Sequence, residues 1–184
     1  MHVTKVLAVS GSLRAASINT ALLRATARLA PPGTEVALLH GLGDLPLFNP
    51  DLETRVPDSV VAMRSAVAAA DALLIASPEY AHGVTGTVKN MLDWLVSYEP
   101  FVNKPVALLN ASPRAHHADA ALRETLRTMS ALLVEEASVS IPLLGSSLDE
   151  DGIVRSPDIA QALKTALAAL HRAADPCASG PFED

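Results

Sequence analysis

The sequence has little sulfur and no long apolar segment. Cys177 is the only cysteine among 184 residues, so no disulfide can form within the chain, and we interpret it as an incidental exposed thiol. No apolar run is long enough for a membrane-spanning helix, and the first residues do not resemble an export signal. These absences predict a protein that is not associated with a membrane and that works in a reducing, cytoplasmic setting.

Positive charge is also scarce. Lys and Arg number 14 against 20 Asp and Glu, which gives a net charge of -6, and the basic residues form no run. Because nucleic acids bind basic surfaces, we expect no nucleic-acid partner. Hydrophobic residues make up 49% of the chain, and its length fits one globular domain. We place that domain at residues 1–175, followed by a tail at residues 176–184.

Short apolar runs alternate along the chain with longer amphipathic segments. Runs of four to six apolar residues are typical of parallel strands that are covered on both faces. The predicted strands are residues 5–9, 35–39, 72–76, 106–109 and 137–141. The predicted helices are residues 19–29, 58–69, 87–96, 118–133 and 159–173. This alternation predicts a doubly wound α/β domain with a five-stranded parallel sheet and helices on both faces.

Polar or glycine-containing segments follow three of the predicted strands, at residues 10–19, 77–86 and 111–117. In doubly wound sheets, ligands bind beyond the carboxyl ends of the strands, where the strand order reverses. We therefore expect these three segments to meet and to form the binding site.

The first polar segment, residues 10–19, reads SGSLRAASIN. It lacks the three spaced glycines of a dinucleotide fold and the Gly-Lys-Ser/Thr end of a P-loop. It does offer the hydroxyls of Ser12 and Ser17, the amide of Asn19 and the guanidinium of Arg14 before a predicted helix start, where backbone N–H groups attract anions. This set suits a terminal phosphate monoester. The alternative is that Ser12 or Ser17 serves only as a helix N-cap.

Three stretches resemble the NADPH-dependent FMN reductase family, which includes quinone, chromate and azo reductases. Residues 11–19 resemble its phosphate signature, and residues 44–53 (DLPLFNPDLE) are similar to its second connection. Residues 77–80 (SPEY) followed by residues 86–94 (GTVKNMLDW) resemble its most specific motif. Together the similarity covers about residues 5–135.

The resemblance implies a flavodoxin-like fold that binds FMN and uses NADPH or NADH as its reductant. Electrons would pass to a small acceptor, such as a quinone, an azo or nitro compound, a metal oxyanion or a flavin. It also implies a homodimer or homotetramer, with the helix that carries Trp94 near the interface. A flavodoxin-type electron carrier and a non-catalytic flavin-binding sensor are the alternatives. The carrier is disfavoured because only six residues are aromatic and a carrier covers its flavin with aromatic rings.

By the same resemblance, residues 78–83 lie along the flavin, with Pro78 stiffening the turn and Gly83 supplying unusual backbone angles. No catalytic nucleophile is expected, since the flavin carries the chemistry. The predicted cofactor-binding residues are Ser10, Ser12, Leu13, Arg14, Ser17, Asn19, Pro78, Glu79, Tyr80, Ala81, His82, Gly83, Ser112 and Arg114.

The chain departs from the family in two of these loops. Ala81 stands where Asn is usual, and Thr85 stands where Pro usually precedes the glycine. Residues 111–119 (ASPRAHHAD) lack the family's glycine pair, so bulky side chains either cover part of the flavin or point away. We predict no metal at His116 and His117, because adjacent histidines cannot readily share one ion. They are either exposed to solvent or in contact with the substrate.

Overall fold

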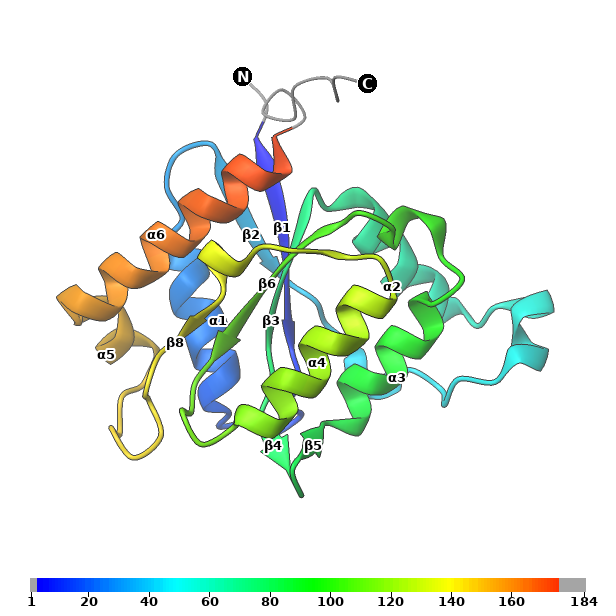
Figure 1. The fold of residues 1–184 in the computed structure, drawn as a ribbon, viewed down its shortest axis with the longest axis horizontal. Coiled ribbons are helices and arrows are strands. Elements are labelled where there is room, and N and C mark those ends of the chain that lie inside the picture. Colours follow the sequence, from blue (N-terminus) through cyan, green and yellow to red (C-terminus); the bar gives the residue numbers. More distant parts are fainter. Residues whose placement is uncertain (1–2, 176–184) are drawn as a thin grey trace.

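The structure is a computed structural model that describes residues 3–175, so Cys177 and the predicted tail lie outside the described residues. A mostly parallel sheet crosses the molecule between two layers of helices (Figure 1). The strands are β1 (Thr4–Ser10), β2 (Thr34–Leu38), β3 (Ala72–Ala76), β4 (Glu79–Tyr80), β5 (Gly83–Val84), β6 (Pro105–Asn110), β7 (Leu132–Leu133) and β8 (Val139–Ser140). The α-helices are α1 (Ile18–Arg28), α2 (Asp58–Ala69), α3 (Gly86–Leu95), α4 (His116–Thr128), α5 (Glu150–Arg155) and α6 (Pro157–Ala174). Short 3-10 helices are η1 (Leu42–Asp44), η2 (Pro50–Arg55), η3 (Glu99–Phe101) and η4 (Glu135–Ala137).

The strand order of the main sheet is β2-β1-β3-β6, with β7 and β8 both paired to β6. This order reverses between β1 and β3, which is the switch point of flavodoxin-like sheets. The predicted doubly wound α/β fold is confirmed. In the part of the chain that the structure describes, no helix is long and apolar enough to cross a membrane.

Both faces of the central strands are buried, as their continuous apolar sequences predict. Leu73 and Ile75 of β3 pack in one core with α2, α3 and α4, whereas Leu74 and Ala76 pack in the other with α1, α5 and α6. Figure 1 shows these two groups of helices on opposite sides of the sheet. Alternate residues of a strand point to opposite faces, so two helix layers leave no position of β3 for a polar side chain.

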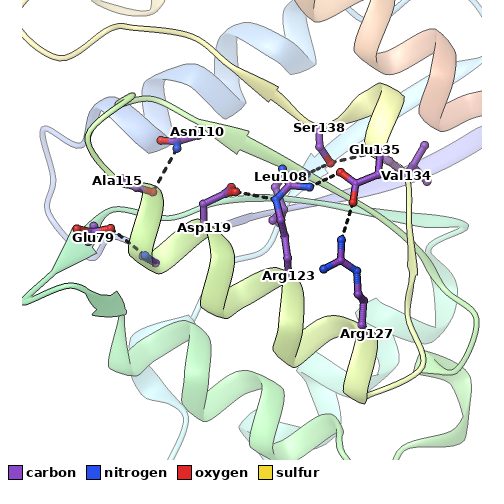
Figure 2. A network of polar contacts seen from close by, with 11 residues as sticks. Glu79, Leu108, Asn110, Ala115, Asp119, Arg123, Arg127, Val134, Glu135 and Ser138 are labelled. Carbon is purple, nitrogen blue, oxygen red and sulfur yellow. Dashed lines mark hydrogen bonds and ion pairs between the residues drawn. The ribbon is translucent and has the colours of Figure 1, made fainter.

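The predicted fifth strand at residues 137–141 is wrong in its extent, because two short pieces occupy that edge of the sheet. β7 pairs with the start of β6 and β8 pairs with its end, and η4 lies between the two. There the side chain of Ser138 replaces a strand partner: its Oγ accepts a hydrogen bond from the backbone N of Leu108 (3.1 Å) and donates one to the carbonyl of Val134 (2.9 Å) (Figure 2). The edge position is therefore filled without a continuous strand.

The helix predicted at residues 118–133 also ends earlier than expected. α4 ends at Thr128, and Ser130 has a positive φ of 59°, which turns the chain back toward the sheet. Leu132–Leu133 can then pair with β6 as β7. Because both α4 and β7 contain apolar residues, hydrophobic periodicity does not show where the helix ends.

Trp94 is fully buried within its own chain. Its Nε1 donates a hydrogen bond to the carbonyl of Pro46 (2.8 Å), and its ring meets Phe48 edge-on at 5.0 Å between centroids. The tryptophan therefore fixes the long connection before α2 against α3. It has no exposed surface with which to contact a second subunit.

Candidate functional site

A cleft of about 450 Å³ opens beyond the carboxyl ends of β1, β3 and β6. The loops after these strands form its walls, joined by one residue from the segment after β8. The lining residues are Ser12, Arg14, Ala16, Ser17, Ile18, Asn19, Ser77, Pro78, Glu79, Tyr80, Asn110, Ala111, Ser112, Arg114, Ala115 and Leu144. The structure thus brings together the three polar segments, in a volume typical of small-molecule sites.

The first wall is the loop from β1 into α1. Ser17 is the N-cap of α1, and its Oγ accepts a hydrogen bond from the backbone N of Thr20 (3.3 Å), so the capping interpretation holds for Ser17. The Oγ of Ser12 accepts a bond from the backbone N of Arg14 (3.3 Å). The guanidinium of Arg14 has no ion-pair partner among residues 3–175 and is exposed at the cleft.

Asn19 is the unusual residue of this wall. Its side chain is only 5% exposed, yet its Oδ1 has no hydrogen-bond partner within the described part of the chain. A buried polar atom left unpaired costs about 1–3 kcal/mol, so most such atoms in proteins have a partner. Because Asn19 lines the cleft, a ligand can supply that partner, and rotation of the amide can offer its NH₂ group instead.

Gly11 sets how closely the first and second walls approach. A Cβ at this position would lie 2.3 Å from Oγ and 2.7 Å from Cβ of Ser77, and 2.9 Å from Val88 in α3. The carbonyl of Gly11 also accepts a hydrogen bond from Oγ1 of Thr87 (3.1 Å). The absence of a side chain therefore allows the β1 loop to pack directly on the β3 loop and on α3.

The second wall is the antiparallel hairpin of β4 and β5. Pro78, Glu79 and Tyr80 line the cleft, whereas the next three residues do not. The positive φ angles occur at Ala81 (49°) and His82 (59°). The prediction that Gly83 supplies the unusual backbone angle is wrong, because the turn reverses the chain one and two residues earlier.

Glu79 joins this hairpin to the third wall. Its carboxylate accepts a hydrogen bond from the backbone N of Ala118 (2.8 Å) in the first turn of α4 (Figure 2). That backbone bond is the main reason why the pKa of Glu79 lies below its usual value, and the electrostatic interactions with His117 and His82 act in the same direction. A backbone N–H group at the start of α4 thereby has its hydrogen-bond partner within the protein.

The third wall is the short loop between β6 and α4. The side chain of Asn110 holds it at both ends: Oδ1 accepts a bond from the N of Ser112 (2.9 Å), and Nδ2 donates to the carbonyl of Ala115 (3.3 Å) (Figure 2). Ser112 and Arg114 line the cleft, and Arg114 has no ion-pair partner among residues 3–175. In the place of the family's glycine pair, the chain therefore offers a second guanidinium.

His116 and His117 are exposed and do not line the cleft. His117 instead stacks on His82, with ring centroids 4.4 Å apart, and His116 lies beside His117 at 4.1 Å. Between the two alternatives left by the sequence, substrate contact is disfavoured. Within residues 3–175 no three His, Cys, Asp or Glu side chains are placed to hold a metal ion.

Ion pairs hold α4 against the broken edge strand. Arg123 binds Asp119 through Nε (2.6 Å) and also pairs with Glu135, which in turn pairs with Arg127 (2.8 Å) (Figure 2). Arg123 and Asp119 are largely shielded from solvent, whereas Glu135 and Arg127 are more than half exposed, so salt screens the two pairs with Glu135 more than the pair within α4. The helix whose start borders the cleft is thus anchored along its length.

Nine of the fourteen predicted site residues line the cleft. Those that do not are Ser10, Leu13, Ala81, His82 and Gly83, and for them cofactor contact stays a prediction. The Oγ of Ser10 shares a hydrogen bond with Oγ1 of Thr20 (2.8 Å), which directs it into the protein. Leu13 extends toward Gly43, at the edge of the neighbouring connection.

Seven lining residues were not among the fourteen predicted site residues, although five of them lie within the three segments that were expected to form the site. Most are neighbours of predicted ones: Ala16, Ile18, Ser77, Asn110, Ala111 and Ala115. Leu144 is the exception, since it follows β8 and is 63% exposed although it is apolar. The predicted fifth strand could have identified Leu144, because the carboxyl end of that strand lies at the same edge of the sheet as the other three loops.

Comparison with known proteins identifies the family of the chain. Residues 4–144 match the family model described as NADPH-dependent FMN reductase. The chain is 34% identical over 172 residues to an NAD(P)H-dependent FMN reductase of Pseudomonas aeruginosa, covering 90% of this chain and 92% of the relative. It is 32% identical over 167 residues to a 2-hydroxy-1,4-benzoquinone reductase of a Burkholderia species, covering 88% and 91%.

A solved structure leads to the same family. FerB, a flavoenzyme NAD(P)H:(acceptor) oxidoreductase from Paracoccus denitrificans, superposes with a TM-score of 0.81 at 30% identity, covering 91% of this chain and 95% of FerB. The predicted FMN cofactor, NAD(P)H reductant and oxidoreductase activity are confirmed at the level of the family, and the electron-carrier and sensor alternatives are not favoured. The chain belongs to the NADPH-dependent FMN reductase family.

Proposed function

We propose that this cleft binds FMN, with Ser12, Arg14, Ser17 and Asn19 holding the phosphate end. The observation that carries the proposal is the polar set at the start of α1. Among residues 3–175, the buried Oδ1 of Asn19 has no hydrogen-bond partner and the guanidinium of Arg14 has no ion-pair partner, and both residues line the cleft. A helix N-terminus adds partial positive charge to this place. The donors present therefore fit a phosphate monoester.

The other two walls would hold the ring of the cofactor. Pro78, Glu79 and Tyr80 line one of these walls, and Ser112 and Arg114 line the other. The backbone N–H groups of Ser112 and Arg114 are bonded within their own loop, so that wall would contact the ring through side chains. The chemistry that bound FMN supplies is the transfer of a hydride equivalent from NAD(P)H to a second substrate. Arg114 places positive charge on the third wall of the cleft, where it favours an electron-rich or anionic partner.

Open space and apolar surface at the mouth favour an enzyme over an electron carrier. Tyr80 is the only aromatic residue that lines the cleft within the described chain, and it is 59% exposed. Leu144 lies at the same mouth. Exposed apolar side chains beside a binding cleft are expected where flat organic molecules enter and leave. We infer that NAD(P)H and a quinone-type acceptor use this mouth in turn.

Steady-state kinetics with NADPH and a quinone test this inference. Two substrates that occupy one place alternately give parallel lines in double-reciprocal plots, because no complex contains both. Lines that intersect at every quinone concentration would require both substrates to bind together. The shared mouth would then be rejected.

We also infer a homodimer or homotetramer. Large apolar side chains are exposed on α2, at the end of α3 and on the connections around them; these are Leu47, Val61, Val96 and Val102, with Leu47 83% exposed. Light scattering during size-exclusion chromatography gives the mass, and a monomer at micromolar concentration would refute the inference. A cytoplasmic location and a single domain at residues 1–175 stay predictions.

A further inference from the structure

The turn between β4 and β5 is made of residues that do not favour its shape. Tyr80 pairs with Gly83, so only Ala81 and His82 make the turn, and both have positive φ angles (49° and 59°). Two-residue hairpin turns of this type favour Asn and Gly, because a Cβ disfavours the left-handed region. Something outside the turn must therefore hold it in this conformation.

Two contacts reach the turn from the start of α4. The ring of His117 lies on the ring of His82, with centroids 4.4 Å apart and planes inclined by 23°. On the strand before the turn, the carboxylate of Glu79 accepts a hydrogen bond from the backbone N of Ala118 (2.8 Å). The first contact thus holds the turn itself and the second holds β4, and both come from the first turn of α4.

The position of this turn affects the cleft directly. Glu79 and Tyr80 line the cleft and immediately precede the strained residues, whereas His82 and His117 do not line it. If the turn relaxes, the two residues before it cannot keep their backbone position. His117 therefore does not contact a ligand in the cleft itself, and its ring reaches the cleft wall through the hairpin.

We propose that His117 is a positioning residue: by stacking on His82, together with the bond from Ala118 to Glu79, it holds the strained turn and so fixes residues 78–80 as a wall of the cleft. The proposal rests on the proposed function, since FMN is the ligand whose affinity reports the position of this wall. It assigns a role to His117, which the metal and substrate interpretations left without one.

The first experiment compares FMN affinity of the apoprotein before and after His117→Ala. Loss of one stacked aromatic pair should weaken binding about 2- to 12-fold. His117→Phe keeps a ring without a titrating group and should bind FMN as the wild type does. An unchanged affinity in His117→Ala would overturn the proposal.

A second pair of variants separates positioning from general destabilisation. Ala81→Asn combined with His82→Gly gives the turn residues that adopt positive φ without help. In that background the stack is absent and the turn does not need it, so His117→Ala should have no effect on FMN affinity. If His117→Ala weakens binding equally in both backgrounds, the histidine does not act through the turn and the proposal is wrong.

Hydrogen exchange tests the turn without any flavin. In the apoprotein, the peptide that contains residues 79–84 should exchange faster in His117→Ala than in the wild type and should recover in His117→Phe. Unchanged exchange would refute the positioning role. If exchange responds as expected but the wild type does not bind FMN, the positioning role stands and the proposed function fails.

Discussion

Replacing Arg14 by alanine tests the phosphate site with a magnitude that the structure sets. The guanidinium is exposed at the cleft and makes no ion pair within residues 3–175, so its removal breaks nothing that holds the fold. What it removes is a charge-assisted hydrogen bond to a bound phosphate, worth about 1.5–3 kcal/mol. The dissociation constant of FMN should therefore rise about 10- to 150-fold.

Riboflavin is the control ligand for this experiment. It has the same ring and ribityl chain but no phosphate, so Arg14→Ala should change its affinity little. Arg24→Ala is the matched control, because Arg24 is exposed on α1, does not line the cleft and removes the same charge. Titration of the apoproteins by flavin fluorescence gives all these constants. If FMN and riboflavin weaken equally, or if Arg24→Ala has the same effect, residues 12–19 do not bind the phosphate.

Three further predictions follow from individual contacts. Gly11→Ala should lower the free energy of unfolding, measured by urea denaturation, by about 1–3 kcal/mol, because its Cβ would clash with the side chain of Ser77. Adding Ser77→Gly should recover part of the loss, and wild-type stability in Gly11→Ala would refute the packing argument. Glu79 has a lowered pKa in the folded protein, so its bond to α4 stabilises the fold above about pH 4.3, and this stabilisation is lost as the pH falls through the lowered pKa. The difference in urea midpoint between wild type and Glu79→Gln should therefore shrink on acidification, and a difference independent of pH would contradict this. Arg114→Gly should raise the ratio of activity with a bulky azo dye to activity with a small quinone, whereas His116→Gly should leave this ratio unchanged, because His116 does not line the cleft. Equal ratios in both variants would show that the Arg114 side chain does not limit access.

Elements with one dominant physical signal could be predicted from the sequence. The central strands are continuous apolar runs because helices cover both of their faces, and β3 was predicted with the bounds that the structure has, Ala72–Ala76. The meeting of the three polar loops followed from strand polarity alone. Ser17 was predicted as either a cap or a ligand, and its place at the cleft and its bond to Thr20 show that the two are compatible.

Features that depend on tertiary contacts could not be predicted. Local periodicity does not show that Ser138 completes the edge of the sheet with its hydroxyl, because its partner Leu108 is 30 residues away. The left-handed turn at Ala81 and His82 contradicts local preference, which is why the unusual backbone angle was assigned to Gly83. Leu144 reaches the cleft from a segment with no motif of its own.

Anaerobic titration of the FMN-loaded protein with NADPH tests the central claim most directly. The account predicts that purified protein binds one FMN per chain and that NADPH alone bleaches its visible flavin absorbance, while a quinone added afterwards restores it. Arg14→Ala should lose bound FMN on gel filtration more readily than Arg24→Ala. A wild-type protein that retains no FMN, or whose bound FMN stays oxidised with both NADPH and NADH, would contradict the account.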